Sequence, residues 1–299
     1  MAVPISEKVA VVEKVAVPKT VAVPVLAETV AVPVFRGHMR LHVLCLCALL
    51  AGAACAKARP ALPSGPGTPF PDFQAAYDAA VSDCRAARTV VAELGLSGRA
   101  GDTRLRGRIT AGFAEPSAIR LEGVVLGRPI FILVSKDEAA TLLLVREDRI
   151  VRDAPPEAIV EALAGVALTP AELRAAVAGC ALGAGTPANG RMFTGEWAAV
   201  DTDDGMTYLR RIDGRWRVGG ASRGRLRIVY ADFAAGLPGT IHVRSDSDAG
   251  TALADITLRV SQLEINTDID AKAFEIQVPP NAVPLSIAEL RRAGPLGDR

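Results

Sequence analysis

Residues 153–180 contain two short amphipathic helical patterns, and the sequence on either side of them reads as β-strands. Prolines near the start of each pattern suit the first turn of a helix, where a backbone N–H has no partner within the helix. Thr169, followed three residues later by Glu172, predicts a capping box at the second helix start. Each helix has only one apolar face, which must be buried on another surface. A helical insert in a β-rich chain therefore predicts a lid that covers a sheet.

The apolar stripes of these two helices supply the residues expected to face the sheet and any cavity beneath the lid. On or beside the helical repeat these are Ile159, Leu163, Val166, Leu168, Leu173 and Val177. An aliphatic lining suits an apolar ligand, but an ordinary core has the same composition. The sequence leaves open whether the interior is hollow or filled.

The sequence outside the insert reads as successive antiparallel strands. Between residues 91 and 146, apolar residues alternate with polar ones, which is the pattern of a sheet with one solvated face. Further runs follow, from Met192–Val200 to Phe274–Val278, and Asp-Gly pairs between them predict hairpins. No alternation of strands and helices indicates a parallel sheet. We expect a mainly β, α+β fold of about 10–11 antiparallel strands, preceded by a helix over Asp72–Arg88.

Composition narrows the functional classes. The chain of 299 residues has 34 Lys and Arg against 33 Asp and Glu, a net charge of +1 that does not favour a nucleic-acid partner. Half of the residues are apolar and only 4% are aromatic, so aliphatic side chains must form the core. His242 is the only histidine after the first 42 residues, which excludes a site with several histidine ligands there. We expect no metal, no cofactor and no catalytic residue.

The N-terminus carries an export signal. Residues 1–38 repeat Val-Ala-Val-Pro and predict a low-complexity segment, or an extension upstream of the true start. Residues 39–55 have a positive charge at Arg40, a short apolar run and small residues before Cys55, as in a signal peptide of the lipoprotein type. Cys55 is the expected lipidated residue, and cleavage nearby without lipidation is the alternative.

The remaining chain divides into a tether and one folded domain. Residues 56–69 are rich in Ala, Pro and Gly and predict a tether, and residues 70–299 form the domain. The domain contains Cys84 and Cys180, and export to an oxidising compartment favours a disulfide between them. Two buried free thiols are the alternative.

The order of these elements resembles the LolA/LolB lipoprotein-carrier superfamily and is closer to LolB. The motifs that carry the resemblance span roughly residues 70–295 and are Leu96-Ser97-Gly98-Arg99, Gly107-Arg108-Ile109, the insert from Leu163 to Gly179, and the closing stretch Phe274–Pro280. The resemblance implies an incomplete antiparallel β-barrel with an N-terminal helix and a two-helix lid over an apolar cavity. It also implies a non-enzymatic, lipid-anchored role at the periplasmic face of the outer membrane, in lipoprotein localisation.

The resemblance further implies partners and one exposed residue. The expected partners are the acyl chains of lipoproteins or other lipids, the inner leaflet of the outer membrane and a soluble periplasmic carrier. Leu126 is the expected counterpart of a leucine that protrudes from a loop between early strands, and a buried leucine at a strand end is the alternative. A structural outer-membrane lipoprotein with a filled core and a protein partner is the second functional hypothesis.

A serine hydrolase is a further alternative. Gly220-Ala221-Ser222-Arg223-Gly224 matches the G-x-S-x-G pattern, and Asp232 and His242 follow in hydrolase order. This motif needs a strand before the serine and a helix after it. Residues 225–230 read as another strand, so a Gly- and Ser-rich turn between two strands explains the same residues.

Overall fold

The structure is a computed structural model that describes residues 61–183 and 185–293. These residues belong to the second of two units into which the chain divides, Arg59–Arg299. The predictions for residues 1–38, for the signal at 39–55 and for Cys55 lie outside the described residues.

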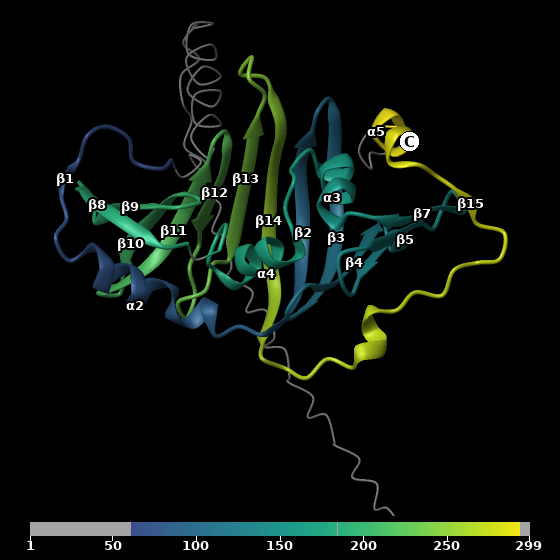
Figure 1. The fold of residues 1–299 in the computed structure, drawn as a ribbon, viewed down its shortest axis with the longest axis horizontal. Coiled ribbons are helices and arrows are strands. Elements are labelled where there is room, and N and C mark those ends of the chain that lie inside the picture. The colour runs from purple at the N-terminus through teal and green to yellow at the C-terminus, as the bar shows by residue number, and fades with distance from the viewer. Residues whose placement is uncertain (1–60, 184, 294–299) are drawn as a thin grey trace, which may run out of the picture. The chain divides into compact units, whose positions relative to one another are not determined.

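One sheet dominates the described part of the chain (Figure 1). In spatial order its strands are β1 (Thr68–Pro69), β8 (Pro187–Phe193), β9 (Trp197–Thr202), β10 (Gly205–Ile212), β11 (Arg215–Arg223), β12 (Leu226–Ala231), β13 (Thr240–Asp246), β14 (Ala252–Ile265), β2 (Thr89–Ala100), β3 (Thr103–Ala114), β4 (Ala118–Val125), β5 (Arg128–Ser135), β6 (Ala140–Leu144), β7 (Arg149–Ala154) and β15 (Val283–Pro284). Neighbours are antiparallel, except that β15 is parallel to β7. Because the order ends at β1 and β15, the sheet is open, which confirms the expected incomplete barrel.

Pairing of β14 with β2 joins the two halves of the sheet. Strands β2–β7 follow one another along the chain and in space, as do β8–β14. The long ladder from Ala254–Ala100 to Ile265–Val90 then connects the last strand of the second series to the first strand of the first. This ladder places the early hairpins beside the late ones and makes one continuous surface.

Several strand predictions need correction. The sheet has 15 strands within the described residues, more than the 10–11 expected. The predicted strand Met192–Val200 is a hairpin, because Phe193 pairs with Trp197 across a tight turn. The predicted strand Phe274–Val278 is not formed: a 3₁₀ helix, η1 (Ala271–Phe274), leads into irregular chain. Arg120 holds this segment by donating from Nη1 to the carbonyls of Ala273 and Glu275, each at 2.9 Å.

The helices lie on the sheet as the sequence predicts, with one addition. They are α2 (Phe73–Arg85), α3 (Pro156–Ala164), α4 (Pro170–Ala178) and α5 (Ile287–Ala293), of which α5 was not expected. The capping box of Thr169 and Glu172 is formed. Helix α3 ends at Gly165, whose φ of 71° is a left-handed conformation that glycine adopts without steric cost. A Cβ there would also lie 2.5 Å from the carbonyl oxygen of Leu253, so no other residue fits without a shift.

Two buried clusters divide the core, and each lid helix belongs to a different one. Val177 and Ala176 of α4 pack in a large cluster with Tyr77, Tyr230 and Phe113. Residues of α3 pack instead in a smaller cluster with residues of β5–β7 and α5: Ile159, Val160, Ala162, Leu163, Leu133, Leu142, Leu285 and Leu290. In Figure 1 the two helices lie in front of the central strands β14, β2 and β3. The lid therefore spans the boundary between the two clusters.

Candidate functional site

A cavity of about 140 Å³ lies between the lid and the central strands. The sheet contributes Leu96, Leu105, Ile109, Leu121, Ile256 and other aliphatic side chains to its wall. Among the described residues that line it, none is Asp or Glu, and the charged ones are Arg106 and Arg108. An apolar wall with charge confined to two neighbouring positions can hold a hydrocarbon chain but offers no acid–base pair for catalysis.

The lid residues expected from the sequence divide between the cavity and the core. Those that line the cavity are Leu163, Val166, Leu168 and Leu173. Ile159 lies outside the lining and is fully buried in the smaller cluster. Val177 is likewise buried in the larger cluster. The sequence analysis did not identify Val160 and Ala164 of α3 as lining residues, although they lie beside Leu163 in the same helix.

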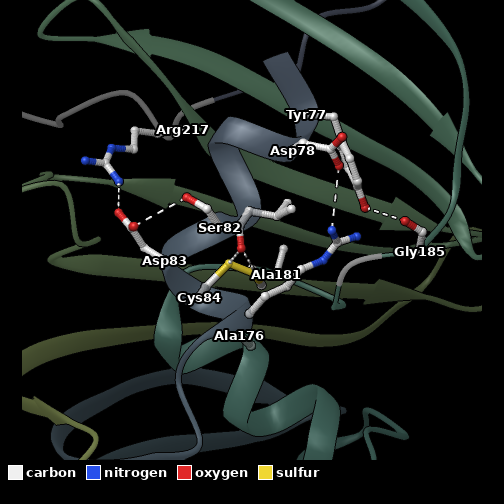
Figure 2. Close-up of a disulfide and its surroundings, with 12 residues drawn as sticks. Tyr77, Asp78, Ser82, Asp83, Cys84, Ala176, Ala181, Gly185 and Arg217 are labelled. Atoms are coloured by element: carbon white, nitrogen blue, oxygen red, sulfur yellow. Dashed lines mark hydrogen bonds and ion pairs between the residues drawn. A yellow bond between two sulfur atoms is a disulfide. The ribbon is translucent and has the colours of Figure 1, made fainter. Parts of the chain in front are cut away.

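Helix α4 is fastened to the sheet and to α2 (Figure 2). Cys180, just after α4, forms a disulfide with Cys84 of α2, with 5.6 Å between the two Cα atoms. The buried Tyr230 hydroxyl donates to the carbonyl of Ala176 at 2.5 Å and accepts from the N–H of Ala181 at 2.7 Å. Burial raises the pKa of Tyr230, so this hydroxyl stays protonated and keeps both bonds.

The start of α4 is tied to the neighbouring hairpin as well. The Glu172 carboxylate, which completes the capping box by accepting from the N–H of Thr169 at 2.9 Å, also pairs with Arg223 at the end of β11. Both ends of α4 are therefore bonded to other elements.

Helix α2, which carries the other cysteine of the disulfide, is also bonded to neighbouring segments. The Tyr77 hydroxyl donates to the carbonyl of Gly185 at 2.8 Å, and Arg217 of β11 pairs with Asp83 at 2.6 Å, as Figure 2 shows. Burial raises the pKa of Tyr77, whereas the hydrogen bond from Arg217 lowers the pKa of Asp83. These bonds hold α2, and with it the disulfide, against the sheet.

Helix α3 has a different and more exposed attachment. Arg291 of α5 pairs with Glu161 of α3 at 2.8 Å, and about half of each side chain is exposed. Leu285 and Leu290 pack against the apolar face of α3. An exposed ion pair contributes little to stability, so this packing carries most of the attachment. The contacts of α4 include a disulfide and buried hydrogen bonds, whereas α3 is held by apolar packing against β5–β7 and α5.

The cavity continues into an open groove at one end of β3 and β4. Six residues line both spaces: Leu96, Arg106, Gly107, Arg108, Val124 and Val125. The β3–β4 ladder stops at the Arg108–Val124 pair, so β3 continues from Gly107 to Thr103 without a β4 partner. A Cβ at Gly107 would lie 2.7 Å from the carbonyl oxygen of Val124, so only glycine lets the strands pass this closely. We call this space the mouth groove.

Leu126 stands at the tip of the β4–β5 hairpin beside the mouth groove. It is 97% exposed, so the alternative of a buried strand-end leucine is wrong. Val125 pairs with Arg128, and the two residues between them have φ values of 50° for Leu126 and 76° for Gly127. Two-residue hairpin turns with positive φ at both positions favour Asn or Asp before Gly. Leucine at this position exposes an apolar side chain and adopts an unfavourable backbone conformation.

The hydrolase motif lacks the local structure that it requires. Ser222 lies near the end of β11, and within the described chain a tight turn leads from it into strand β12 rather than into a helix. Ser222 pairs with Arg227 of β12, whereas His242 lies on β13, on the other side of that strand. The Nδ1 atom of His242 is 3.1 Å from the Thr257 hydroxyl. The expected strand–turn–helix arrangement is therefore not present at Ser222.

Part of the expected tether belongs to the domain. Thr68–Pro69 forms β1 and pairs with β8. Leu62 packs over Gly220, where an added Cβ would be 2.9 Å from the Leu62 Cδ2 atom. The structure thus places residues from Ala61 onward along the outside of the sheet.

Two further features of the described residues bear on the site. They contain no cluster of three or more His, Cys, Asp or Glu side chains arranged to hold a metal ion. None of the helices in this part of the chain has the length and apolar character needed to cross a bilayer.

Comparison with known proteins gives similarity of fold alone. No protein-family model and no curated protein sequence matches the chain. The fold is similar to that of a LolA superfamily protein from Nitrosomonas europaea, with a TM-score of 0.44 and 12% identity over 68% of this chain and 95% of that one. A domain from Vibrio parahaemolyticus assigned to outer membrane lipoprotein sorting gives 0.42 and 8% over 67% and 96%. The lipoprotein LppX from Mycobacterium tuberculosis gives 0.30 and 11% over 67% and 99%. At these scores, a function has to be argued from this chain's own cavity and surface.

Proposed function

We propose that this chain is an exported, non-enzymatic protein that binds acyl chains beneath its lid. In this proposal Cys55 carries the lipid anchor and holds the domain at the periplasmic face of the outer membrane. The cargo is the acyl part of lipoproteins or of other lipids, the role is lipoprotein localisation, and a soluble periplasmic carrier delivers the cargo. The observation that carries the proposal is the aliphatic cavity between the lid and the sheet, whose described lining has no acidic residue.

The exposed leucine supports a membrane-facing role for the same end of the domain. Leu126 lies next to the mouth groove, which is continuous with the cavity. A leucine at the tip of a hairpin can enter the acyl region of a leaflet, where burial of the side chain is favourable by about 1.5–3 kcal/mol. Insertion there would bring the cavity mouth to the surface from which lipid enters or leaves.

The cavity has to enlarge to take a full acyl chain. An apolar cavity of about 150 Å³ holds a molecule of the size of benzene, and this cavity is about 140 Å³. Helix α4 is held by the disulfide and by Tyr230, whereas α3 depends on its packing with α5. We therefore expect α3 to move outward together with α5, while α4 stays in place.

The test is ligand recovery from the full chain carrying Cys55→Ser, expressed in a bacterial periplasm. Native mass spectrometry of the purified protein should detect a co-purifying acyl species. Leu163→Glu should remove it, because a carboxylate in the cavity wall opposes an apolar ligand. Leu253→Glu is the matched control, since Leu253 is 44% exposed and does not line the cavity.

A second variant separates loss of binding from loss of folding. Val166→Trp fills the cavity with apolar volume and should block uptake without burying a charge. Thermal unfolding measured by circular dichroism shows which variants keep the fold. Protein that is free of lipid and also takes up no added fluorescent apolar probe would refute the proposal. A structural lipoprotein with a protein partner would then be the better interpretation.

A further inference from the structure

The mouth groove is cationic. Strand β3 alternates buried Leu105 with exposed Arg106 and Arg108, and both arginines line the groove and the cavity. Within the described residues neither arginine forms a salt bridge, although many other arginines of the chain do. The described lining of the groove contains no Asp or Glu. Two positive charges thus stand at the entrance to an apolar cavity.

Two more arginines extend this cluster. Arg104 lies on the same face of β3, two residues before Arg106, and Arg128 starts β5 directly after the Leu126–Gly127 turn. Asp255 and Arg99 line the adjoining surface together with Arg104 and Arg106, so one carboxylate lies on the Arg106 side of the groove. Arg106, Arg108 and Leu126 all line the groove itself, whereas Arg128 follows the turn at its edge.

The spacing of Arg106 and Arg108 suits one small anion. Alternate residues of a strand lie on the same face, about 7 Å apart along it. Two guanidinium groups on flexible stems at this separation can approach one anion from both sides, each donating two N–H groups. Arginine forks match the oxygens of a phosphate, and such charge-assisted bonds are stronger than neutral ones.

We propose that the mouth groove binds the phosphoryl headgroup of an anionic lipid whose acyl chain occupies the cavity. This inference rests on the proposed acyl-binding function and assigns the class of ligand to that site. The headgroup contacts Arg106 and Arg108 in the groove, and the chain passes the tip of the β4–β5 hairpin toward the lid. A neutral acylglycerol of the same chain length fills the cavity but has no anion for the arginines.

The experiment compares two lipids that differ only in the headgroup. Full chain carrying Cys55→Ser is loaded with the apolar fluorophore N-phenyl-1-naphthylamine and titrated with palmitoyl lysophosphatidate or with monopalmitoylglycerol, both below their aggregation concentrations. Lysophosphatidate should displace the fluorophore at a concentration about tenfold lower, as expected for one or two charge-assisted contacts at a partly solvated site. Raising the salt from low to high ionic strength should reduce that preference.

The arginine variants test the assignment. In the variant that carries both Arg106→Gln and Arg108→Gln, lysophosphatidate and monopalmitoylglycerol should displace the fluorophore at the same concentration, so that the preference for lysophosphatidate is lost while neutral lipid still binds. Arg146→Gln is the matched control, because Arg146 is an exposed arginine in the turn between β6 and β7, away from the groove. The control should keep the full preference.

The outcomes separate the two proposals. Equal displacement by both lipids would overturn the headgroup site and leave acyl binding intact. A preference that persists in the double variant would overturn the assignment to these arginines. No displacement by either lipid would overturn acyl binding itself. A preference lost in the double variant and kept in the control supports the inference.

Discussion

Replacing Leu126 by Asn should stabilise the fold and weaken membrane binding at the same time. The leucine is 97% exposed, so its removal costs no packing within the described domain. Its φ of 50° lies in the left-handed region, which costs an L-residue about 1–2 kcal/mol and which Asn adopts more readily than Leu. We therefore expect the Leu126→Asn substitution to raise the free energy of unfolding by up to about 1 kcal/mol.

The effect on membrane binding has the opposite sign. Transfer of a leucine side chain from water to an apolar environment is favourable by about 1.5–3 kcal/mol, and 1.4 kcal/mol corresponds to a factor of ten in partitioning. Losing this contact should reduce vesicle binding at least tenfold. Urea denaturation measures the stability, and co-flotation with phosphatidylethanolamine–phosphatidylglycerol vesicles measures the binding, both with the full chain carrying Cys55→Ser.

A second exposed apolar residue supplies the control. Val283 is 56% exposed and lies on β15, at the end of the sheet order and away from the mouth groove. Val283→Thr should leave vesicle binding unchanged. If Leu126→Asn lowers the stability, the leucine serves the fold and the strain argument is wrong. If it leaves vesicle binding intact, the membrane contact assigned to Leu126 is wrong.

Two further predictions concern the attachment of α4. Tyr230→Phe removes the hydroxyl that bonds to the Ala176 carbonyl and to the Ala181 N–H. Because two buried backbone groups then lose their partner, the free energy of unfolding, measured by urea denaturation, should fall by about 2–4 kcal/mol. Tyr208→Phe is the near-neutral control, and a similar loss in both would contradict the assigned role of the Tyr230 hydroxyl. Replacing both Cys84 and Cys180 by Ala should lower the free energy of unfolding by about 4–5 kcal/mol, the chain-entropy value for a separation of 96 residues. A reducing agent should destabilise the parent chain and leave this double variant unaffected, and equal sensitivity of the two would show that the bridge does not form.

The lid helices could be predicted because their signals are local. Proline at the first position, the Thr169–Glu172 capping box and a glycine after each helix all act within a few residues. Such signals do not depend on where the helix packs. The observed starts of the two helices, at Pro156 and Pro170, therefore agree with the predicted ones.

The extra and missing strands depend on contacts that no local pattern records. Strands β1 and β15 are two residues long and exist only because distant segments pair with them. Phe274–Val278 has the composition of a strand, but it pairs with no strand, and Arg120 binds the carbonyls of Ala273 and Glu275 at its start. The β-propensity of a segment shows that it can form a strand. Whether it does so depends on a neighbouring strand with which it can pair.

The division between core and cavity could not be predicted for the same reason. Ile159 and Leu163 are one turn apart on the same apolar face of α3, yet the first is fully buried among α5 and β6 contacts and the second lines the cavity. Likewise, the alternation of β3 predicts exposed arginines. Only the end of the β3–β4 ladder at Val124 brings Arg106 and Arg108 to the mouth of the cavity.

Leu126 differs from these positions because it violates two local rules and no packing contact explains either violation. The turn rule favours Asn or Asp where the backbone has a positive φ before glycine, and the burial rule favours a polar residue where the side chain is almost fully exposed. An ordinary surface turn gains stability from any substitution that satisfies both rules. A residue that satisfies neither rule is the kind of position from which a functional hypothesis is drawn. In the proposed function Leu126 interacts with an anionic lipid surface, an interaction that would be favoured by an apolar tip and by the arginines of the mouth groove together.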